Sequence, residues 1–267
     1  MSEYIYCIKR AAIDPEYWDN VIRGSEQSVI YALSWYLDAV AEDWEALVWP
    51  SEQNYEVVMP LPTRQKLGFK VVYQPFFCQF LGFYWQKPPS ETLVRDFWRR
   101  LVSDYAYVSN YAFHPLNTPY LYQLAQATPD LNAKTLHTHT LDLSNRHTAI
   151  RSGYSSDRRR NLTRGQGQFW RLVRSTDPRP LVDLFIQNHA QQIEGGVSQA
   201  SMEIFLKLAD ILLHKQYAQL TYALDAKNEI CAGVLIVNEQ ARHVYLFNAA
   251  SLAGRVGNAR TVLLDHH

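Results

Sequence analysis

The order of apolar patterns between residues 134 and 264 constrains the fold of this chain more than any other feature. Short β-branched or apolar runs predict strands over Lys134–Leu143, Trp170–Arg174, Tyr217–Leu224, Glu229–Asn238 and His243–Ala249. Apolar residues at helical spacing, or helix-start signals, predict helices over Ser156–Gln168, Pro180–Gln192, Ser201–Lys215 and Asn258–Leu264. This alternation predicts a unit in which helices pack on a sheet.

The first half of the chain has a comparable mixture of patterns. Strands are expected over Glu3–Ala12, Ala46–Trp49, Tyr55–Pro60 and Tyr105–Phe113, and helices over Pro15–Val21, Ser28–Ala41 and Ser90–Ser103. The two halves are not separated by a linker rich in Pro, Gly or Ser. We therefore expect two closely packed subdomains, at 1–143 and 144–267.

Composition narrows the classes of function. Lys and Arg together number 26, as do Asp and Glu, so the net charge is zero and does not by itself select a nucleic acid. The three cysteines are widely separated, which argues against a disulfide framework or a zinc site, and no metal site is predicted. No apolar run reaches the length of a membrane span and no leader is recognised, so a cytoplasmic location is expected.

The densest local charge lies between Arg151 and Arg174, where seven arginines face a single acidic residue, Asp157. On a helix, Arg160 and Arg164 share one face. Arginine forks bind carboxylate and phosphate groups, so this face is a candidate anion site. Two alternatives stay open: a solvated basic face, or nucleic-acid binding assisted by neighbouring aromatic side chains.

A second candidate is the stretch from Phe247 to Arg260, where a strand runs through small residues into a helix. A helix start offers unpaired N–H groups to a pyrophosphate, and Gly254 and Gly257 would allow close approach. Arg255 and Arg260 add positive charge. The alternative is an ordinary strand-to-helix connection.

These two segments together resemble a known family. The stretches Tyr154–Leu162 and Val244–Leu264 are similar to segments of the FemAB/FemX-type branch of the GNAT-like acyltransferases. Weaker similarity extends to the first half, over Val29–Tyr31, Ser34-Trp35, Met59-Pro60 and Gln74–Phe77. The resemblance implies an α+β fold of tandem GNAT-like subdomains, with mixed sheets flanked by helices. It also implies that the second subdomain is truncated.

The resemblance implies an N-acyltransferase that moves an acyl or aminoacyl group to an amine. The donor would be acyl-CoA or aminoacyl-tRNA, a co-substrate rather than a tightly bound cofactor. The acceptor would be a small molecule or a peptide, with tRNA as a further partner and a homodimer left open. Because the loop before the last helix is one residue shorter than the family pattern, a non-catalytic, degenerate member that binds a ligand or partner is the alternative.

Particular residues receive roles from this resemblance. Donor or phosphate binding is assigned to Asn248, Arg255, Gly257, Asn258, Ala259, Arg260, Arg160 and Arg164. Glu194 is the candidate base and Tyr245 the candidate acid for the leaving group. Trp35 and Lys66 would hold the acceptor. The plainer alternatives are a surface carboxylate for Glu194, a core side chain for Tyr245, and packing or surface roles for the last two.

Overall fold

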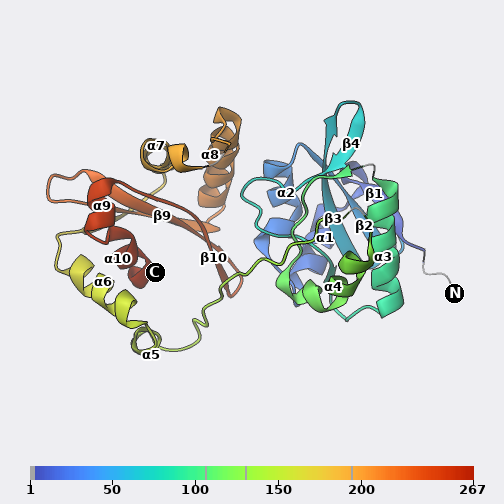
Figure 1. Cartoon of the computed structure of the whole chain (residues 1–267), viewed down its shortest axis with the longest axis horizontal. Helices are drawn as coiled ribbons and strands as arrows, with labels where there is room; N and C mark the ends of the chain where they lie inside the picture. The colour runs from blue at the N-terminus through green and yellow to red at the C-terminus, as the bar shows by residue number, and fades with distance from the viewer. Residues whose placement is uncertain (1–3, 106, 130, 194) are drawn as a thin grey trace. The chain divides into compact units, whose positions relative to one another are not determined.

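A computed structural model describes residues 4–105, 107–129, 131–193 and 195–267 (Figure 1). The chain divides into two compact units, Met1–Thr138 and His139–His267. Each unit has its own sheet with helices packed on it, so the α+β class with helix-flanked sheets is confirmed. Whether each unit is GNAT-like stays a prediction.

The first unit contains a mixed sheet in the order β1-β2-β3-β4-β6, with β5 also paired to β3. Among the strands that the structure describes, only β4 and β6 pair in parallel. Its strands are β1 (Tyr6–Lys9), β2 (Asp43–Pro50), β3 (Tyr55–Lys66), β4 (Phe69–Val72), β5 (Tyr84–Trp85) and β6 (Tyr107–Val108). Its helices are α1 (Pro15–Arg23), α2 (Ser34–Val40), α3 (Glu91–Asp104) and α4 (Thr118–Ala127), with 3-10 turns η1 (Arg10–Ala12), η2 (Ile30–Ala32) and η3 (Pro115–Asn117).

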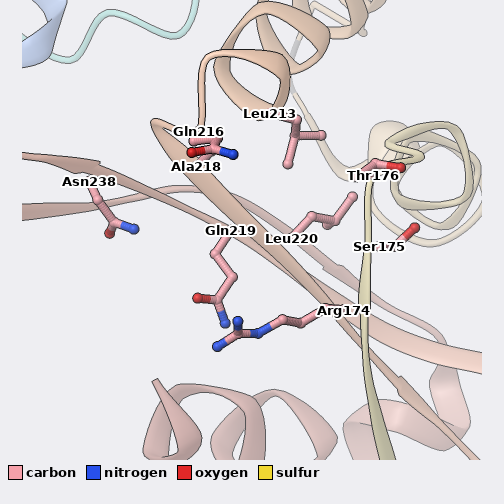
Figure 2. Close-up of a pocket in the computed structure, with 9 residues that line it drawn as sticks. All are labelled: Arg174, Ser175, Thr176, Leu213, Gln216, Ala218, Gln219, Leu220 and Asn238. Atoms are coloured by element: carbon pink, nitrogen blue, oxygen red, sulfur yellow. The ribbon is translucent and has the colours of Figure 1, made fainter.

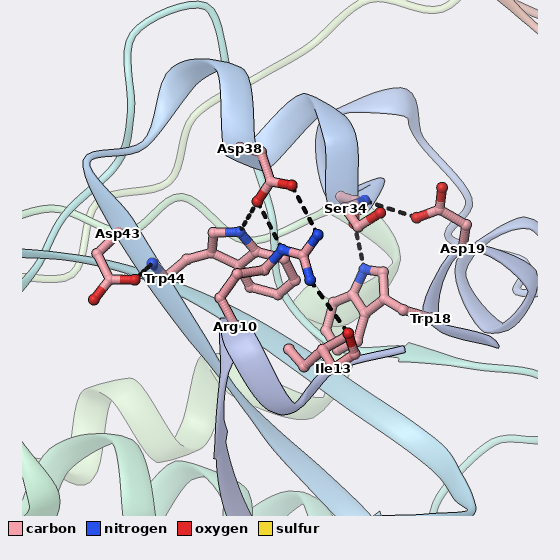
Figure 3. Close-up of polar contacts among 9 residues, drawn as sticks. Arg10, Ile13, Trp18, Asp19, Ser34, Asp38, Asp43 and Trp44 are labelled. Carbon is pink, nitrogen blue, oxygen red and sulfur yellow. Dashed lines mark hydrogen bonds and ion pairs between the residues drawn. The ribbon is translucent and has the colours of Figure 1, made fainter. Parts of the chain in front are cut away.

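Buried tryptophans fix α1 and α2 against β2 (Figure 3). Trp18 is fully buried, packs at 5.2 Å from Trp44 between ring centroids, and donates its indole N–H to the Ala32 carbonyl at 2.8 Å. The Trp44 indole donates to Asp38 at 2.8 Å, and Arg10 donates to both oxygens of the same carboxylate. Each buried indole thus has its polar atom satisfied, which lets large aromatic rings fill this core.

Glu45 is a buried carboxylate at the centre of the first unit's sheet. Tyr105 donates its hydroxyl to Oε1 at 2.6 Å and Lys70 donates Nζ to Oε2 at 2.8 Å. Burial and the neighbouring carboxylate raise the pKa of Tyr105. Tyr105 lies just after α3, so this network connects that helix to β2 and β4.

Replacing Glu45 by alanine is expected to destabilise the chain by about 3 kcal/mol, because it leaves a buried hydroxyl without its acceptor and an ammonium without its counter-ion. Urea unfolding followed by tryptophan fluorescence would measure the change. Glu56→Ala is the matched control, since Glu56 is an exposed glutamate on the neighbouring strand β3. Equal stability of the two variants would show that the Glu45 network does not hold this sheet together.

The second unit contains an antiparallel sheet in the order β10-β9-β8-β7. Its strands are β7 (Arg171–Ser175), β8 (Ala218–Leu224), β9 (Ile230–Glu239) and β10 (Arg242–Ala250). Its helices are α5 (His147–Ser152), α6 (Ser156–Gln166), α7 (Arg179–Asn188), α8 (Gln199–His214), α9 (Leu252–Val256) and α10 (Ala259–His266), with the 3-10 turn η4 (Ala190–Gln192).

Helices cover both faces of this sheet (Figure 1). On one face Phe247 of β10 packs against Phe185 of α7 and Phe205 of α8, with ring centroids 4.9 and 4.2 Å apart. On the other face α10 buries Ala259 and Leu263 completely in a cluster with residues of β8 and β9. Helix α6 packs on the outside of α10. The two layers hold β10 in place and determine which of its side chains meet α7 and which meet α10.

Several element predictions are wrong. Lys134–Leu143 is not a strand: its side chains are all exposed, so its alternating pattern has no face to bury. The predicted helix Ser28–Ala41 is interrupted after η2, where Leu33 adopts an extended conformation before α2. Of the strand predicted over Tyr105–Phe113, only β6 is observed in the described residues. The expected loop of small residues after β10 contains the helix α9.

No helix in the described part of the chain combines the length and the apolar character that crossing a bilayer requires.

Candidate functional site

The open edge of β10 is the structural centre of the candidate site. Among the described strands, β10 pairs only with β9. The Ser251 N–H donates to the Cys231 carbonyl at 2.9 Å, and Ala249 pairs with Gly233 in the same register. Because antiparallel strands alternate between hydrogen-bonded and non-bonded pairs, the backbone N–H groups of Asn248 and Ala250 point to the open side. The Ala250 N–H lies 3.2 Å from His189 Nε2, and the Asn248 N–H is directed away from β9.

A β-bulge in β10 determines which side chains share a face. The register shifts between Tyr245 and Phe247, which leaves Leu246 as the extra residue. Without the shift, residues 245 and 247 would point to the same face. Instead Phe247 points to α7, while Tyr245 joins Asn248 on the face of α10, where the positive charges of Arg260 and Arg158 act on its hydroxyl. Bulges commonly re-aim side chains in this way near functional sites.

Arg260 and Asn248, two of the predicted donor-binding residues, are in direct contact. Arg260 of α10 donates from Nη1 to Asn248 Oδ1 at 3.2 Å. The Arg260 side chain is exposed, so the rest of its guanidinium faces solvent. Tyr245 is 42% exposed and lies close enough to Arg260 for that charge to act on it, while the partial burial of its ring has the larger effect and raises the pKa of the hydroxyl to about 12. The structure thus brings together three predicted residues from two separate segments.

His189 is a residue of this site that the sequence interpretation missed. It follows α7, and its Nε2 lies 3.1 Å from the Ala250 carbonyl oxygen and 3.2 Å from the Ala250 nitrogen. The Phe185 ring stacks on the imidazole at 6.0 Å between centroids. Burial lowers the pKa of His189, and the charges of Arg255 and Arg260 lower it further. The imidazole is therefore neutral at pH 7 and sits against the open edge of β10.

The neutral ring has one nitrogen available for proton transfer. His189 Nε2 can donate to the Ala250 carbonyl or accept from the Ala250 N–H, depending on the tautomer. In the first tautomer Nδ1 carries the lone pair, and no hydrogen-bond partner is found for it in the described part of the chain. No pattern in the sequence identifies this histidine, because it reaches β10 only through the packing of α7.

Arg255 approaches the same strand end from α9. Its Nη1 lies 3.3 Å from the Ala250 carbonyl oxygen and 3.4 Å from the Asn188 carbonyl oxygen. The side chain is exposed, and these long contacts engage only one of its nitrogens. Arg255, Arg260 and His189 therefore surround the end of β10 with positive charge and one neutral imidazole.

Gly254 and Gly257, which were predicted to leave room for a pyrophosphate, are positions where packing inside the protein leaves no space for a side chain. A Cβ on Gly257 would lie 2.4 Å from the Trp170 ring, and the Trp170 indole donates to the Gly257 carbonyl at 3.1 Å. A Cβ on Gly254 would lie 2.1 Å from the Cys231 carbonyl oxygen. Asn258 adopts a left-handed conformation before α10, with φ of 56°. Ala259 is fully buried, so only its backbone could meet a ligand. Their role in donor binding stays a prediction.

The arginine-rich segment forms α5, α6 and β7, and protein groups already engage part of it. Arg160 pairs with Asp157 at 3.3 Å on an exposed face. Arg151 approaches Asp265 of α10 at 3.4 Å, and Tyr154 donates to the same carboxylate at 3.2 Å. Arg158 lies near Tyr245 and Arg164 is exposed. Arg158 thus extends the positive surface of the β10 edge, while donor binding by Arg160 and Arg164 stays a prediction.

The predicted acceptor residues lie in the first unit. Trp35 is half-buried in α2, with its ring 5.8 Å from that of Tyr36, and Lys66 is exposed at the end of β3. Their acceptor-binding role stays a prediction. Glu194, the predicted base, lies outside the described residues.

Comparisons with known proteins support the fold. No protein-family model matches the chain, and no curated protein matches it. The chain is similar to the crystal structure of FemX, with a TM-score of 0.63 and 9% identity over 95% of this chain and 83% of that one. The structure of L-PGS from Bacillus licheniformis aligns with a TM-score of 0.45, at 10% identity over 95% of this chain and 71% of that one. The predicted FemX-like fold is therefore confirmed.

Proposed function

We propose that this protein is an N-acyltransferase that moves an acyl or aminoacyl group from an activated donor to an amine. The observation that carries the proposal is the open edge of β10, where the Asn248 N–H points outward, His189 and Arg255 contact Ala250, and Arg260 contacts the Asn248 side chain. Such an edge supplies an N–H group that can stabilise a developing oxyanion and a histidine that can accept a proton. It also supplies positive charge that can bind a polyanionic acyl donor. The FemX-like fold is compatible with this chemistry but does not establish it.

The proposed step needs no nucleophile from the protein. The amine attacks the acyl carbonyl carbon, and the negative charge that develops on the carbonyl oxygen is stabilised by the Asn248 N–H. His189 Nδ1 takes one proton from the attacking nitrogen, so the tetrahedral intermediate carries a neutral amine. Collapse breaks the bond to the leaving sulfur or oxygen, which takes a proton from the Tyr245 hydroxyl. Proton transfer from imidazolium to phenolate, through water, then restores both side chains.

An acid at Tyr245 would assist an ester donor more than a thioester. With its pKa raised to about 12, the Tyr245 hydroxyl stays protonated at neutral pH. An alkoxide is a much stronger base than a thiolate and needs a proton to leave, whereas a thiolate, the base of a thiol with a pKa of about 8.5, leaves without one. Within the proposal, an acid at Tyr245 is therefore required for an aminoacyl-tRNA donor but not for acyl-CoA.

Binding measurements separate the donors. Calorimetric titrations with acetyl-CoA and with a non-hydrolysable aminoacyl-tRNA analogue would be run at two salt concentrations. We expect binding of the tRNA analogue to weaken steeply with salt, because the arginines would displace counter-ions from phosphates. Binding of acetyl-CoA alone would reassign the donor. Absence of binding to both would reject the transferase proposal and favour the non-catalytic alternative, a module that binds another ligand or partner.

The remaining features of the proposal follow from the resemblance. Both units are proposed to be GNAT-like, and the donor is a co-substrate, so no tightly bound cofactor is included. The acceptor is proposed to be a small-molecule or peptide amine in a cytoplasmic setting. Light scattering of the purified chain would decide whether it forms a homodimer.

A further inference from the structure

A polar hollow lies in the second unit, at the end of the sheet away from Ala250 (Figure 2). Its volume is about 690 Å³, and its polar lining comes from Arg174, Ser175, Thr176, Gln216, Gln219 and Asn238. Ala250 pairs with Ala232 at the start of β9, whereas Asn238 is near its end, so the two places are roughly 20 Å apart along the strand. The hollow is thus separate from the site at the β10 edge.

The hollow exists because β7 is too short to pair with the first residues of β8. Ser175, the last residue of β7, pairs with Leu220, so Ala218 and Gln219 extend beyond β7 and pair only with β9 among the described strands. Above them α8 has ended, and Gln216 turns the chain with φ of 61°. The missing strand neighbour leaves space that polar side chains line.

Arg174 is an exposed side chain that lies beside Gln219 at this hollow. With its amide oxygen toward the guanidinium, Gln219 accepts from Arg174 Nε at 3.1 Å and from Nη2 at 3.3 Å. The two side chains lie side by side in Figure 2. A neutral amide orients the fork without cancelling its charge, and Nη1 keeps both N–H donors for a ligand.

Among the described residues that line the hollow, Arg174 carries the charge. None of the residues that line it is acidic. His243 lies beside it, with Nδ1 2.6 Å from Asn238 Oδ1. Burial lowers the pKa of the His267 ring, and so does His266. Arg174 and His243 lower this pKa further, with smaller effects. A cation oriented by an amide, beside hydroxyls and further amides, is a lining suited to an oxyanion.

We propose that this hollow binds a small polar molecule through a carboxylate or phosphate group. The Arg174 fork binds the oxyanion, and the amides of Gln219 and Asn238, which lie on the same face of the sheet, bind the rest of the molecule. This site stands independently of the transfer reaction proposed above.

Nuclear magnetic resonance on the full chain tests the proposal with two probes, inorganic phosphate and succinate, titrated at constant ionic strength. Binding of either should shift the side-chain amide signals of Gln219 and Asn238, and the comparison shows which oxyanion the hollow prefers. The Arg174→Gln variant should bind the preferred probe more weakly, by about tenfold or more, because the charge-assisted hydrogen bonds of the guanidinium are lost. Gln219→Leu should weaken it less, because the fork remains but is no longer oriented.

Arg171→Gln is the matched control, since Arg171 is an exposed arginine on the same strand that contacts Asn228. Its affinity for both probes should equal that of the wild type. If neither probe shifts the two amide signals, the hollow is not an oxyanion site. Equal shifts in wild type and Arg174→Gln would also overturn the proposal, because another cationic surface would then bind the probe. Unchanged amide spectra of each variant elsewhere confirm that it is folded.

Discussion

Replacing His189 by glutamine is expected to lower kcat for acyl transfer about a hundredfold while leaving donor affinity nearly unchanged. Glutamine can still donate an N–H to the Ala250 carbonyl, which His189 contacts at 3.1 Å, but it has no basic nitrogen. The loss would therefore report proton acceptance rather than the packing of the strand end. Steady-state rates with a peptide or small-molecule amine acceptor, combined with calorimetry of the donor, measure the two quantities separately.

The pH dependence distinguishes this role from a structural one. Burial, Arg255 and Arg260 lower the pKa of His189 below its usual 6.5, while its hydrogen bond to Ala250 opposes the shift. The imidazole is then the free base at neutral pH, and kcat/KM should fall with acid only below pH 6.5. His189→Gln should remove this acid limb, and Arg260→Gln should move it upward by removing a positive charge. An acid limb that is identical in all three proteins would exclude His189 as the base.

Replacing Arg260 by glutamine is expected to weaken donor binding about tenfold to a hundredfold, as loss of a charge-assisted hydrogen bond of about 1.5–3 kcal/mol predicts. The side chain is exposed and holds Asn248 Oδ1 at 3.2 Å, so the change removes charge from the β10 edge with little loss of packing. Combining it with Arg255→Gln should weaken binding further and reduce the salt dependence of tRNA binding. Calorimetry at two salt concentrations measures both effects.

Arg179→Gln is the control for this experiment. Arg179 is an exposed arginine of the same unit, at the start of α7, and it pairs with Asp177 at 2.7 Å. Its loss changes the net charge equally and should leave donor affinity within about twofold, because exposed pairs contribute little. If Arg179→Gln and Arg260→Gln weaken binding equally, the effect is one of net charge, and the site at β10 is wrongly placed.

Much of the second unit could be predicted from the sequence because its elements are strongly patterned. The helix over Ser201–Lys215 and the hairpin around Asp225–Asn228 are observed as α8, β8 and β9, with small differences at their ends. Both strands of this hairpin carry long apolar runs, which are typical of strands that are buried on both faces of a sheet. The strand predicted over Lys134–Leu143 is not observed. Its apolar residues alternate with polar ones but bury no face, so no packing energy stabilises a strand there.

The FemX-like fold, most elements of the second unit and the positive charge of the segments around Arg158 and Arg260 could be inferred from the sequence. Which of these residues are in contact could be read only from the folded chain. The bulge at Leu246 turns Tyr245 and Asn248 toward Arg260, and the packing of α7 brings His189 to Ala250. Spacing along a chain specifies a residue's face on its own element, but contacts between elements depend on side-chain packing and register shifts across the whole unit.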